Sequence, residues 1–169
     1  MEGLRHSLFA PAASSFFMVM GVATAVKEQI KFRYAAKDDD GKALYPHPYR
    51  PWTEVDPKYK EMGEKAWRAF KMCENVKEWA FFSFPLIWIV ALFGGSLPYV
   101  EESYVSYFLV VTSFLYHYGN HQYIYGYVES PEKRLSGFKL RMKIFQIWLL
   151  ASGVSLMGYG LGALGILSM

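Results

Sequence analysis

Residues 72–88 read MCENVKEWAFFSFPLIW, and they pass from charged side chains directly into an apolar run. The run extends over residues 79–100 and is almost free of charge, which is about the 20 residues that a helix needs to cross a bilayer. Asn75, Lys77 and Glu78 lie immediately before this run. Water is scarce there, so polar groups cost free energy unless they have a partner or a function. The stretch therefore predicts a membrane helix with functional polar groups at one end.

Three other stretches are almost charge-free: residues 7–26, 103–128 and 144–169. The chain is 53% hydrophobic and carries a net charge of +3, with its charged residues concentrated between these stretches. We therefore predict an all-α integral membrane protein, a single domain over residues 1–169 built as a bundle of four transmembrane helices. The expected helices cover about 7–35, 66–95, 102–129 and 132–168, and a long cytosolic loop covers about 36–62. The last stretch holds glycines that predict close packing on another helix, at Gly153, Gly158, Gly160, Gly162 and Gly165.

The first stretch has an alternative interpretation as a signal peptide. The triplet at residues 23–25, Ala-Thr-Ala, resembles a signal-peptide cleavage site. However, the apolar run is longer than the usual signal core, and it continues into KEQIKFRYAA with helical spacing. We favour a retained membrane helix.

The basic residues are distributed unevenly among the three connections. The second connection, GGSLPYVEESY, has two acidic residues and no basic one. The first carries eleven basic residues between positions 27 and 71. The third carries five: Lys133, Arg134, Lys139, Arg141 and Lys143. By the positive-inside rule, we expect the first and third connections in the cytosol and both termini on the opposite side.

Two polar stripes are predicted, one on the second helix and one on the third. The first has spacings of three, four and three: Arg68, Lys71, Asn75 and Glu78. The second consists of Asn120, Tyr123 and Tyr127, with Arg134 seven residues further on. At 3.6 residues per turn, each set lies on one face of its helix. Two such stripes at one depth predict a pocket for a polar, zwitterionic ligand, whose carboxylates meet Arg68 and Lys71 and whose amine meets Glu78.

Structural roles for these residues are the alternative. The cations can reach lipid headgroups, the amide and the acid can join helices by hydrogen bonds, and the tyrosines can form an interfacial belt. His117 and His121 stand four residues apart, a spacing that can hold a metal, but no third ligand is near in the sequence. We therefore expect hydrogen bonding and no metal. The single cysteine, Cys73, is expected to be a small buried side chain.

The run ENVKEW at residues 74–79, followed by YIYGYVESPEKRLSGF at residues 123–138, resembles the family of membrane-associated proteins in eicosanoid and glutathione metabolism (MAPEG). The shared pattern is Asn-x-x-Glu-aromatic, then Tyr-x-x-Gly-Tyr, then an arginine seven residues later. In this chain these positions are Asn75, Glu78, Trp79, Tyr123, Gly126, Tyr127 and Arg134. The KRLSGF run around Arg134 is similar to the transferase branch of the family, and the match is specific only over residues 68–138.

The resemblance implies a homotrimer of four-helix subunits, with glutathione bound between neighbouring subunits. It implies contacts to glutathione from Asn75, Glu78, Trp79, Tyr123 and Tyr127, and the polar stripe of the second helix adds Arg68 and Lys71 as partners for its carboxylates. Lys71 stands where the family usually has an arginine, so the charge is kept but the two-pronged geometry is lost. The family's arginines at the end of the first helix have no clear match, and Gln29 and Lys31 are further contacts in an uncertain register.

The function implied by the resemblance is that of a glutathione-dependent transferase. Arg134 stabilises the thiolate of glutathione, the co-substrate, and the thiolate attacks a hydrophobic electrophile or lipid epoxide arriving from the bilayer, as in leukotriene C synthesis, detoxifying conjugation or peroxide reduction. The implied location is the endoplasmic reticulum or another intracellular membrane of a eukaryotic cell, and no nucleic acid or metal is expected. The alternatives are a non-enzymatic lipid-binding scaffold, like the family's lipoxygenase-activating member, and an unrelated proton-coupled transporter.

Overall fold

The computed structural model describes residues 2–44, 56–130 and 132–166, and these residues form an all-helical structure without β-strands. Its long helices are α1 (Glu2–Ala35), α2 (Lys60–Phe93), α3 (Glu102–Glu129) and α4 (Leu135–Ala163). Two single turns of 3-10 helix, η2 (Pro57–Tyr59) and η3 (Gly94–Ser96), flank α2. The prediction of an all-α structure with four helices is confirmed.

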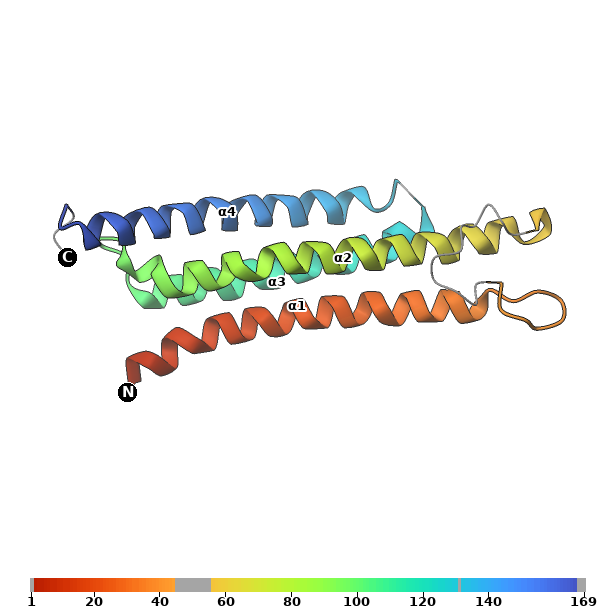
Figure 1. Cartoon of the computed structure of the whole chain (residues 1–169), viewed down its shortest axis with the longest axis horizontal. Coiled ribbons are helices and arrows are strands. Elements are labelled where there is room, and N and C mark those ends of the chain that lie inside the picture. The colour runs from red at the N-terminus through yellow and green to blue at the C-terminus, as the bar shows by residue number, and fades with distance from the viewer. Residues whose placement is uncertain (1, 45–55, 131, 167–169) are drawn as a thin grey trace.

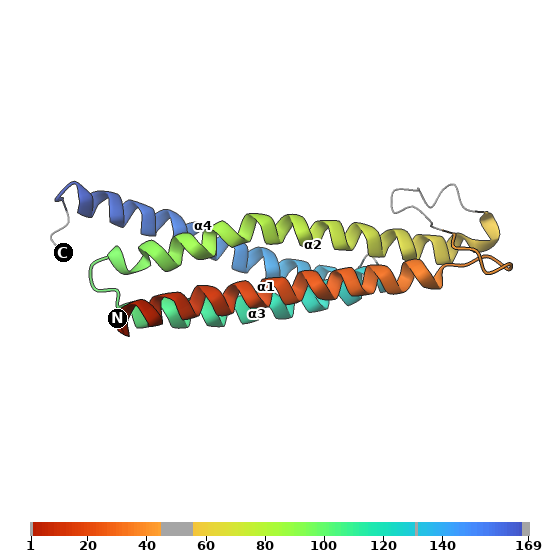
Figure 2. The ribbon, with the colours of Figure 1, turned by 60° about the horizontal axis from the view of Figure 1, so that its bottom comes forward.

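The four helices run side by side in a long, narrow bundle (Figure 1). Both chain ends lie at one end of the bundle, and α1 and α2 extend past the turn between α3 and α4 at the other end (Figure 2). α2 has 34 residues, so it is about 51 Å long, whereas the apolar core of a bilayer is about 30 Å thick. The first turns of α2, which hold most of its charged residues, therefore lie outside a bilayer that covers its apolar part.

Three of the described helices are long and apolar enough to cross a membrane. The qualifying segments are Leu8–Ala35, Pro57–Ser96 and Leu135–Ala163. In the most apolar part of α2 only 22% of the residues are buried within the chain, so most of that apolar surface needs cover from lipid or protein. We predicted four spans, but α3 does not qualify by composition because tyrosine, histidine, asparagine and glutamine lower its hydropathy. The chain therefore has the build of a membrane-associated helical bundle with one more polar helix.

The start of α2 differs from the prediction, which placed it near residue 66. The Asp56 side chain accepts a hydrogen bond from the Lys58 backbone N–H at 2.9 Å, and Pro57 occupies the first position of η2, so the helical path begins there and continues as α2 from Lys60. The carboxylate of Asp39 also bonds to the Lys58 ammonium, which holds the pKa of Asp39 below its ordinary value. The predicted loop about 36–62 is thus shorter, and its residues 45–55 lie outside the described part of the chain.

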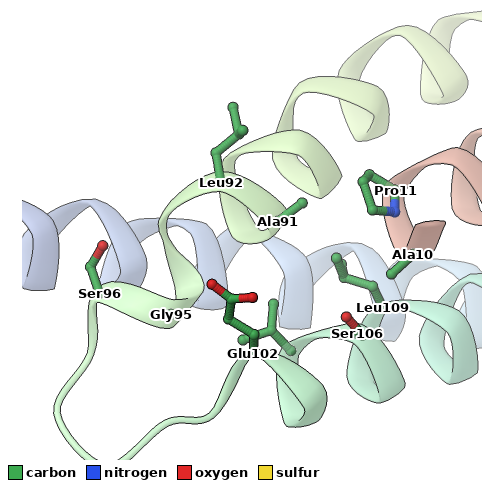
Figure 3. Close-up of a pocket in the computed structure, with 10 residues that line it drawn as sticks. Ala10, Pro11, Ala91, Leu92, Gly95, Ser96, Glu102, Ser106 and Leu109 are labelled. Carbon is green, nitrogen blue, oxygen red and sulfur yellow. The ribbon is translucent and has the colours of Figure 1, made fainter. Parts of the chain in front are cut away.

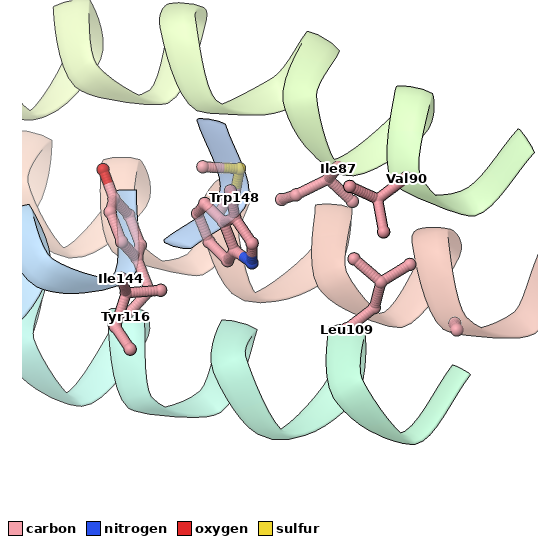
Figure 4. Packing of buried hydrophobic residues seen from close by; sticks show 8 residues of the cluster. Ile87, Val90, Leu109, Tyr116, Ile144 and Trp148 are labelled. Atoms are coloured by element: carbon pink, nitrogen blue, oxygen red, sulfur yellow. The ribbon is translucent and has the colours of Figure 1, made fainter. Parts of the chain in front are cut away.

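Buried side chains from all four helices form the core in the half of the bundle near the chain ends (Figure 4). Trp148 and Tyr116 lie at its centre with ring centroids 4.9 Å apart, and both are almost completely buried. A second cluster, in the other half of the bundle, includes Cys73, Ile124 and Val128. Cys73 has no exposed surface, as the sequence predicted.

The closest helix contact is between α3 and α4. A Cβ atom on Gly137 would lie 2.3 Å from the backbone nitrogen of Tyr123 and 2.5 Å from the carbonyl oxygen of Gly119, so the two backbones touch there. The sequence predicts close packing on another helix at glycines in the later part of α4, but within the single chain added Cβ atoms at Gly153 and Gly160 would meet nothing within 4 Å, and one at Gly158 would meet the side chain of Leu97. The two backbones come closest near the beginning of α4 because Gly119 and Gly137 face each other there. This contact also brings the next turn of α4 against α3.

Candidate functional site

A row of polar side chains follows the inward face of α3. It consists of Thr112, Tyr116, Asn120, Tyr123 and Tyr127, which are spaced by four, four, three and four residues, and we call it the polar row. All but Tyr127 are buried, and Tyr127 is half-buried. Burying so many polar groups in an apolar bundle is unfavourable unless each one has a partner.

Each member of the polar row has a partner on α2 or α4. Asn75 Nδ2 on α2 donates to Tyr123 Oη at 3.0 Å, and Ser83 Oγ donates to Tyr116 Oη at 3.4 Å. The other partners come from α4: Trp148 Nε1 donates to Thr112 Oγ1 at 2.8 Å, Arg141 Nη1 donates to Asn120 Oδ1 at 3.0 Å, and the Arg134 guanidinium lies 4.7 Å from the centroid of the Tyr127 ring. The row therefore fixes how α2, α3 and α4 pack together.

The partners on α4 are spaced by seven residues. Arg134, Arg141 and Trp148 occupy one face of the helix because seven residues make almost two turns. That face lies on α3 because of the close backbone contact at Gly137. The regular spacing is visible in the sequence, but the sequence does not show that this face of the helix packs on α3.

Arg141 is the main correction to the sequence analysis, which placed it among the basic residues of the third connection. It lies inside α4 with no exposed surface. Its guanidinium carbon is 4.1 Å from the centroid of the Tyr123 ring, 5.6 Å from that of Trp79 and 6.0 Å from that of Phe138. Nε and Nη2 of Arg141 are buried and have no hydrogen-bond partner among the described residues. A charge in this position is expensive, and helices in membranes keep such charges mainly for function.

Four of the predicted site residues come together where α3 meets α4. The Asn75–Tyr123 hydrogen bond joins α2 to α3, and the Tyr123 and Tyr127 rings meet edge to face with their centroids 5.3 Å apart. Arg134, half-buried at the N-terminal end of α4, covers the Tyr127 ring. An amide, two phenols and a guanidinium thus lie within one small region, which has the donors and the charge to bind an anion.

Trp79 and Glu78 are neighbours in sequence but point in different directions. Trp79 is half-buried, packs edge-on against Phe145 with centroids 4.9 Å apart, and lies near Arg141. Glu78 is exposed on the outer surface of the single chain. The structure of one chain therefore places the tryptophan, but not the carboxylate, beside the polar row.

Arg68 and Lys71 have local acidic partners on α2. Arg68 Nη1 lies 3.5 Å from a Glu64 carboxylate oxygen, and its Nε is buried without a hydrogen-bond partner in the described part of the chain. Lys71 Nζ lies 3.8 Å from a Glu74 carboxylate oxygen and 5.0 Å from the centroid of the Trp67 ring. Lys71 is exposed enough to exchange its weak surface pair for a ligand carboxylate, and the Arg68 side chain, which is mostly buried, has a free Nε donor for one.

The two residues predicted on the first helix, Gln29 and Lys31, lie near the end of α1. Gln29 is half-buried, and Lys31 is exposed with Nζ 3.5 Å from the carboxylate of Glu28. The Glu28 side chain is almost completely buried. Lys31 therefore compensates a buried acid of its own helix.

The two histidines of α3 face different neighbours. His117 packs against the ring of Phe17 on α1, with centroids 5.8 Å apart, and its Nδ1 is buried without a hydrogen-bond partner among the described residues. His121 is exposed and stacks on Tyr125, with centroids 4.6 Å apart. His117 thus has both an aromatic neighbour and a backbone hydrogen-bond partner at Phe17, because an apolar part of α1 covers the α3 face that carries it.

Two of the cavities that lie away from the polar row border α1. A cavity of about 330 Å³ lies near the chain ends, between the first turns of α1, the end of α2 and the start of α3, and Glu102 is its only charged lining residue (Figure 3). A groove of about 490 Å³ lies between α1 and α2, and its lining is apolar: Met18, Val19, Val22, Ala23, Ala80, Phe81, Phe84 and Pro85. We call the second one the apolar groove. On α2 its lining begins at Ala80, next to Trp79, whose ring lies 5.6 Å from the Arg141 guanidinium. The apolar groove therefore begins at the same level along the bundle as Arg141.

Comparison with known proteins gives no assignment, since neither a protein-family model nor a curated protein matches this chain. The class of protein defined by the fold is a four-helix bundle with three helices suited to a membrane. The site is defined by the polar row and its two arginines on α4.

Proposed function

We propose that this protein is a glutathione-dependent membrane transferase, similar to microsomal glutathione transferase 2 and leukotriene C synthase of the MAPEG family. The observation that carries the proposal is the position of Arg134, half-buried over the Tyr127 ring and next to the Asn75–Tyr123 pair. A guanidinium held in this way offers a permanent positive charge to an anion that binds beside the phenols.

The chemistry needs such a charge because the nucleophile is a thiolate and not a thiol. An unperturbed thiol has a pKa of about 8.5, so only a few per cent is ionised at neutral pH. Each unit by which Arg134 lowers that pKa corresponds to about 1.4 kcal/mol of preferential stabilisation of the anion. The sulfur then forms a bond to carbon of the electrophile. With an epoxide, the carbon–oxygen bond breaks and the alkoxide takes up a proton.

The remaining predicted contacts suit the tripeptide. Asn75 and Tyr123 can hold its amide groups, and Lys71 and Arg68 can bind its carboxylates once they leave Glu74 and Glu64. Glu78 suits the amine, and its exposure in the single chain is compatible with a site that a neighbouring subunit completes. The homotrimer belongs to this proposal, and the apolar surface that the single chain leaves exposed on α1, α2 and α4 is available for neighbouring subunits as well as for lipid.

The apolar groove supports a hydrophobic second substrate. Its volume of about 490 Å³ and its apolar lining suit an acyl chain or another lipid-derived electrophile entering from the bilayer. The same feature favours the second candidate function, a lipid-binding scaffold without enzymatic activity. The two differ in what they require of Arg134, because a scaffold binds lipid without it.

The test is the ultraviolet absorbance of the glutathione thiolate with purified protein in detergent or nanodiscs. We expect wild type to form the thiolate at neutral pH and Arg134→Ala to lose it, while binding of S-hexylglutathione, which has no ionisable thiol, is retained. The matched control is Lys133→Ala, which removes the neighbouring exposed cation that pairs with Glu129. Wild-type protein without a thiolate signal, or equal signals from wild type and Arg134→Ala, would refute the proposal.

A further inference from the structure

We propose that Arg141 is a second cation of the site: its buried and unneutralised charge supports the thiolate of bound glutathione from behind the Tyr123 ring. This inference rests on the proposed function. It assigns Arg141 as a positioning residue, which acts through Tyr123, whereas Arg134 contacts the ligand.

The charge of Arg141 is isolated. Arg141 has no exposed surface, its hydrogen bond goes to the neutral amide of Asn120, and two of its nitrogens have no partner within the described residues. A structural arginine that joins helices is normally paired with a carboxylate or fully hydrogen-bonded. Here the charge is surrounded by aromatic rings, which stabilise a cation without cancelling its field.

The two arginines flank the paired phenols of Tyr123 and Tyr127. Arg134 covers Tyr127, Arg141 lies 4.1 Å from the centroid of Tyr123, and the two rings touch each other. The arginines are seven residues apart on one helix, a rise of about 10 Å. An anion bound beside the two phenols therefore lies between two positive charges.

The hydroxyl of Tyr123 connects Arg141 to a bound ligand. Its oxygen accepts a hydrogen bond from Asn75 Nδ2, so its own hydrogen is free to be donated to a ligand. A cation against the ring makes the phenol a stronger donor because it withdraws electron density from the oxygen. Arg141 thereby acts on the sulfur without touching it.

The other groups around Arg141 leave its charge uncompensated. On α3, the titratable side chains that act on it are the phenols of Tyr116 and Tyr123. On α2, Trp79 and Ser83 line this level, and Glu78 is exposed. On α1, Gly21 lies against Asn120, and Glu28, two turns further along, is paired with Lys31. On α4 itself the nearest charged residues, Lys139 and Lys143, are cations and are exposed.

The test is the pH midpoint of thiolate formation in four variants. Asn120→Asp is the decisive one, because it keeps the shape of the side chain and places a carboxylate 3.0 Å from the guanidinium. We expect it to raise the midpoint by about one pH unit, within the range by which one nearby charge shifts a pKa, while it raises the melting temperature by pairing the buried charge. Arg141→Gln should raise the midpoint by a similar amount, and Arg141→Lys by less, since the charge is kept.

The matched control is Lys143→Gln, which removes an exposed cation from the same helix and should leave the midpoint unchanged. A purely structural role for Arg141 predicts that Asn120→Asp changes the melting temperature and not the midpoint, and that result overturns the inference. One outcome separates the two proposals: wild type and Lys143→Gln form the thiolate, Arg134→Ala does not, and Asn120→Asp has the same midpoint as wild type. In that case the proposed function stands and only the role assigned to Arg141 is wrong. If wild type forms no thiolate, the proposed function itself fails, and the inference fails with it.

Discussion

The contact between α3 and α4 at Gly137 gives the sharpest test of the structure. In Gly137→Ala the new methyl group would lie 2.3 Å from the Tyr123 backbone nitrogen and 2.5 Å from the Gly119 carbonyl oxygen. Neither atom belongs to a flexible side chain, so the two helices must move apart. Overpacking of this kind costs about 1–3 kcal/mol.

The separation also lengthens a hydrogen bond on the next turn. Arg141 Nη1 lies 3.0 Å from Asn120 Oδ1, and a hydrogen bond to a charged group contributes about 1.5–3 kcal/mol. Replacing glycine by alanine inside a helix returns about 1 kcal/mol through helix propensity. We therefore expect a net destabilisation of about 1–4 kcal/mol from overpacking and partial loss of this bond, offset by propensity.

The matched control is Gly153→Ala on the same helix, where an added Cβ atom would meet nothing within 4 Å. It should be neutral or stabilise by up to about 1 kcal/mol. Unfolding of both variants in mixed micelles, followed by tryptophan fluorescence, measures the difference. If Gly137→Ala is as stable as Gly153→Ala, the close crossing of α3 and α4, and the burial of Arg141 that depends on it, are wrong.

Three further predictions concern other parts of the chain. Trp148→Phe removes the hydrogen bond to Thr112 and should destabilise the bundle by about 1 kcal/mol more than Trp88→Phe, whose Nε1 has no partner in the described structure; chemical unfolding compares the two. Cys73 has no exposed surface, so a maleimide should label it only when the protein unfolds. A cysteine at the exposed position 77, made as Lys77→Cys in a Cys73→Ala background, should react at once. Equal labelling rates for the two cysteines would contradict the packing of α2. The pKa of Asp39, measured by NMR, should lie below 3.8 because the carboxylate bonds to Lys58. The contribution of this ion pair to stability is therefore present above pH 3.8 and is lost as the pH falls through the lowered pKa. Lys58→Met should return the pKa of Asp39 to its ordinary value.

Much of the fold could be predicted from the sequence because helix formation in a lipid bilayer depends on residues that are close together in the chain. A run of about 20 apolar residues must satisfy its backbone hydrogen bonds internally, so its length alone indicates a helix. The start of α2 was missed because it depends on the Asp56 side chain and Pro57, a short polar signal within a long loop.

The candidate site was predictable in part. Helical periodicity put Asn75 on one face of α2 and Tyr123 and Tyr127 on one face of α3, and the structure joins Asn75 to Tyr123. Periodicity describes one helix at a time, so it could not tell that Glu78 stays exposed in the single chain while Trp79 turns towards the interior.

The number of helices, their apolar surfaces and the polar pattern along α3 can all be read from the amino-acid sequence, since each of these depends on residues close together in the chain. The burial of Arg141 depends instead on how the helices pack. In the sequence Arg141 is one of five basic residues around a turn, a position typical of contacts with lipid headgroups. The physical reason for the difference is the Gly119–Gly137 contact, which brings α4 so close to α3 that the Arg141 side chain lies between the helices and not at the membrane surface.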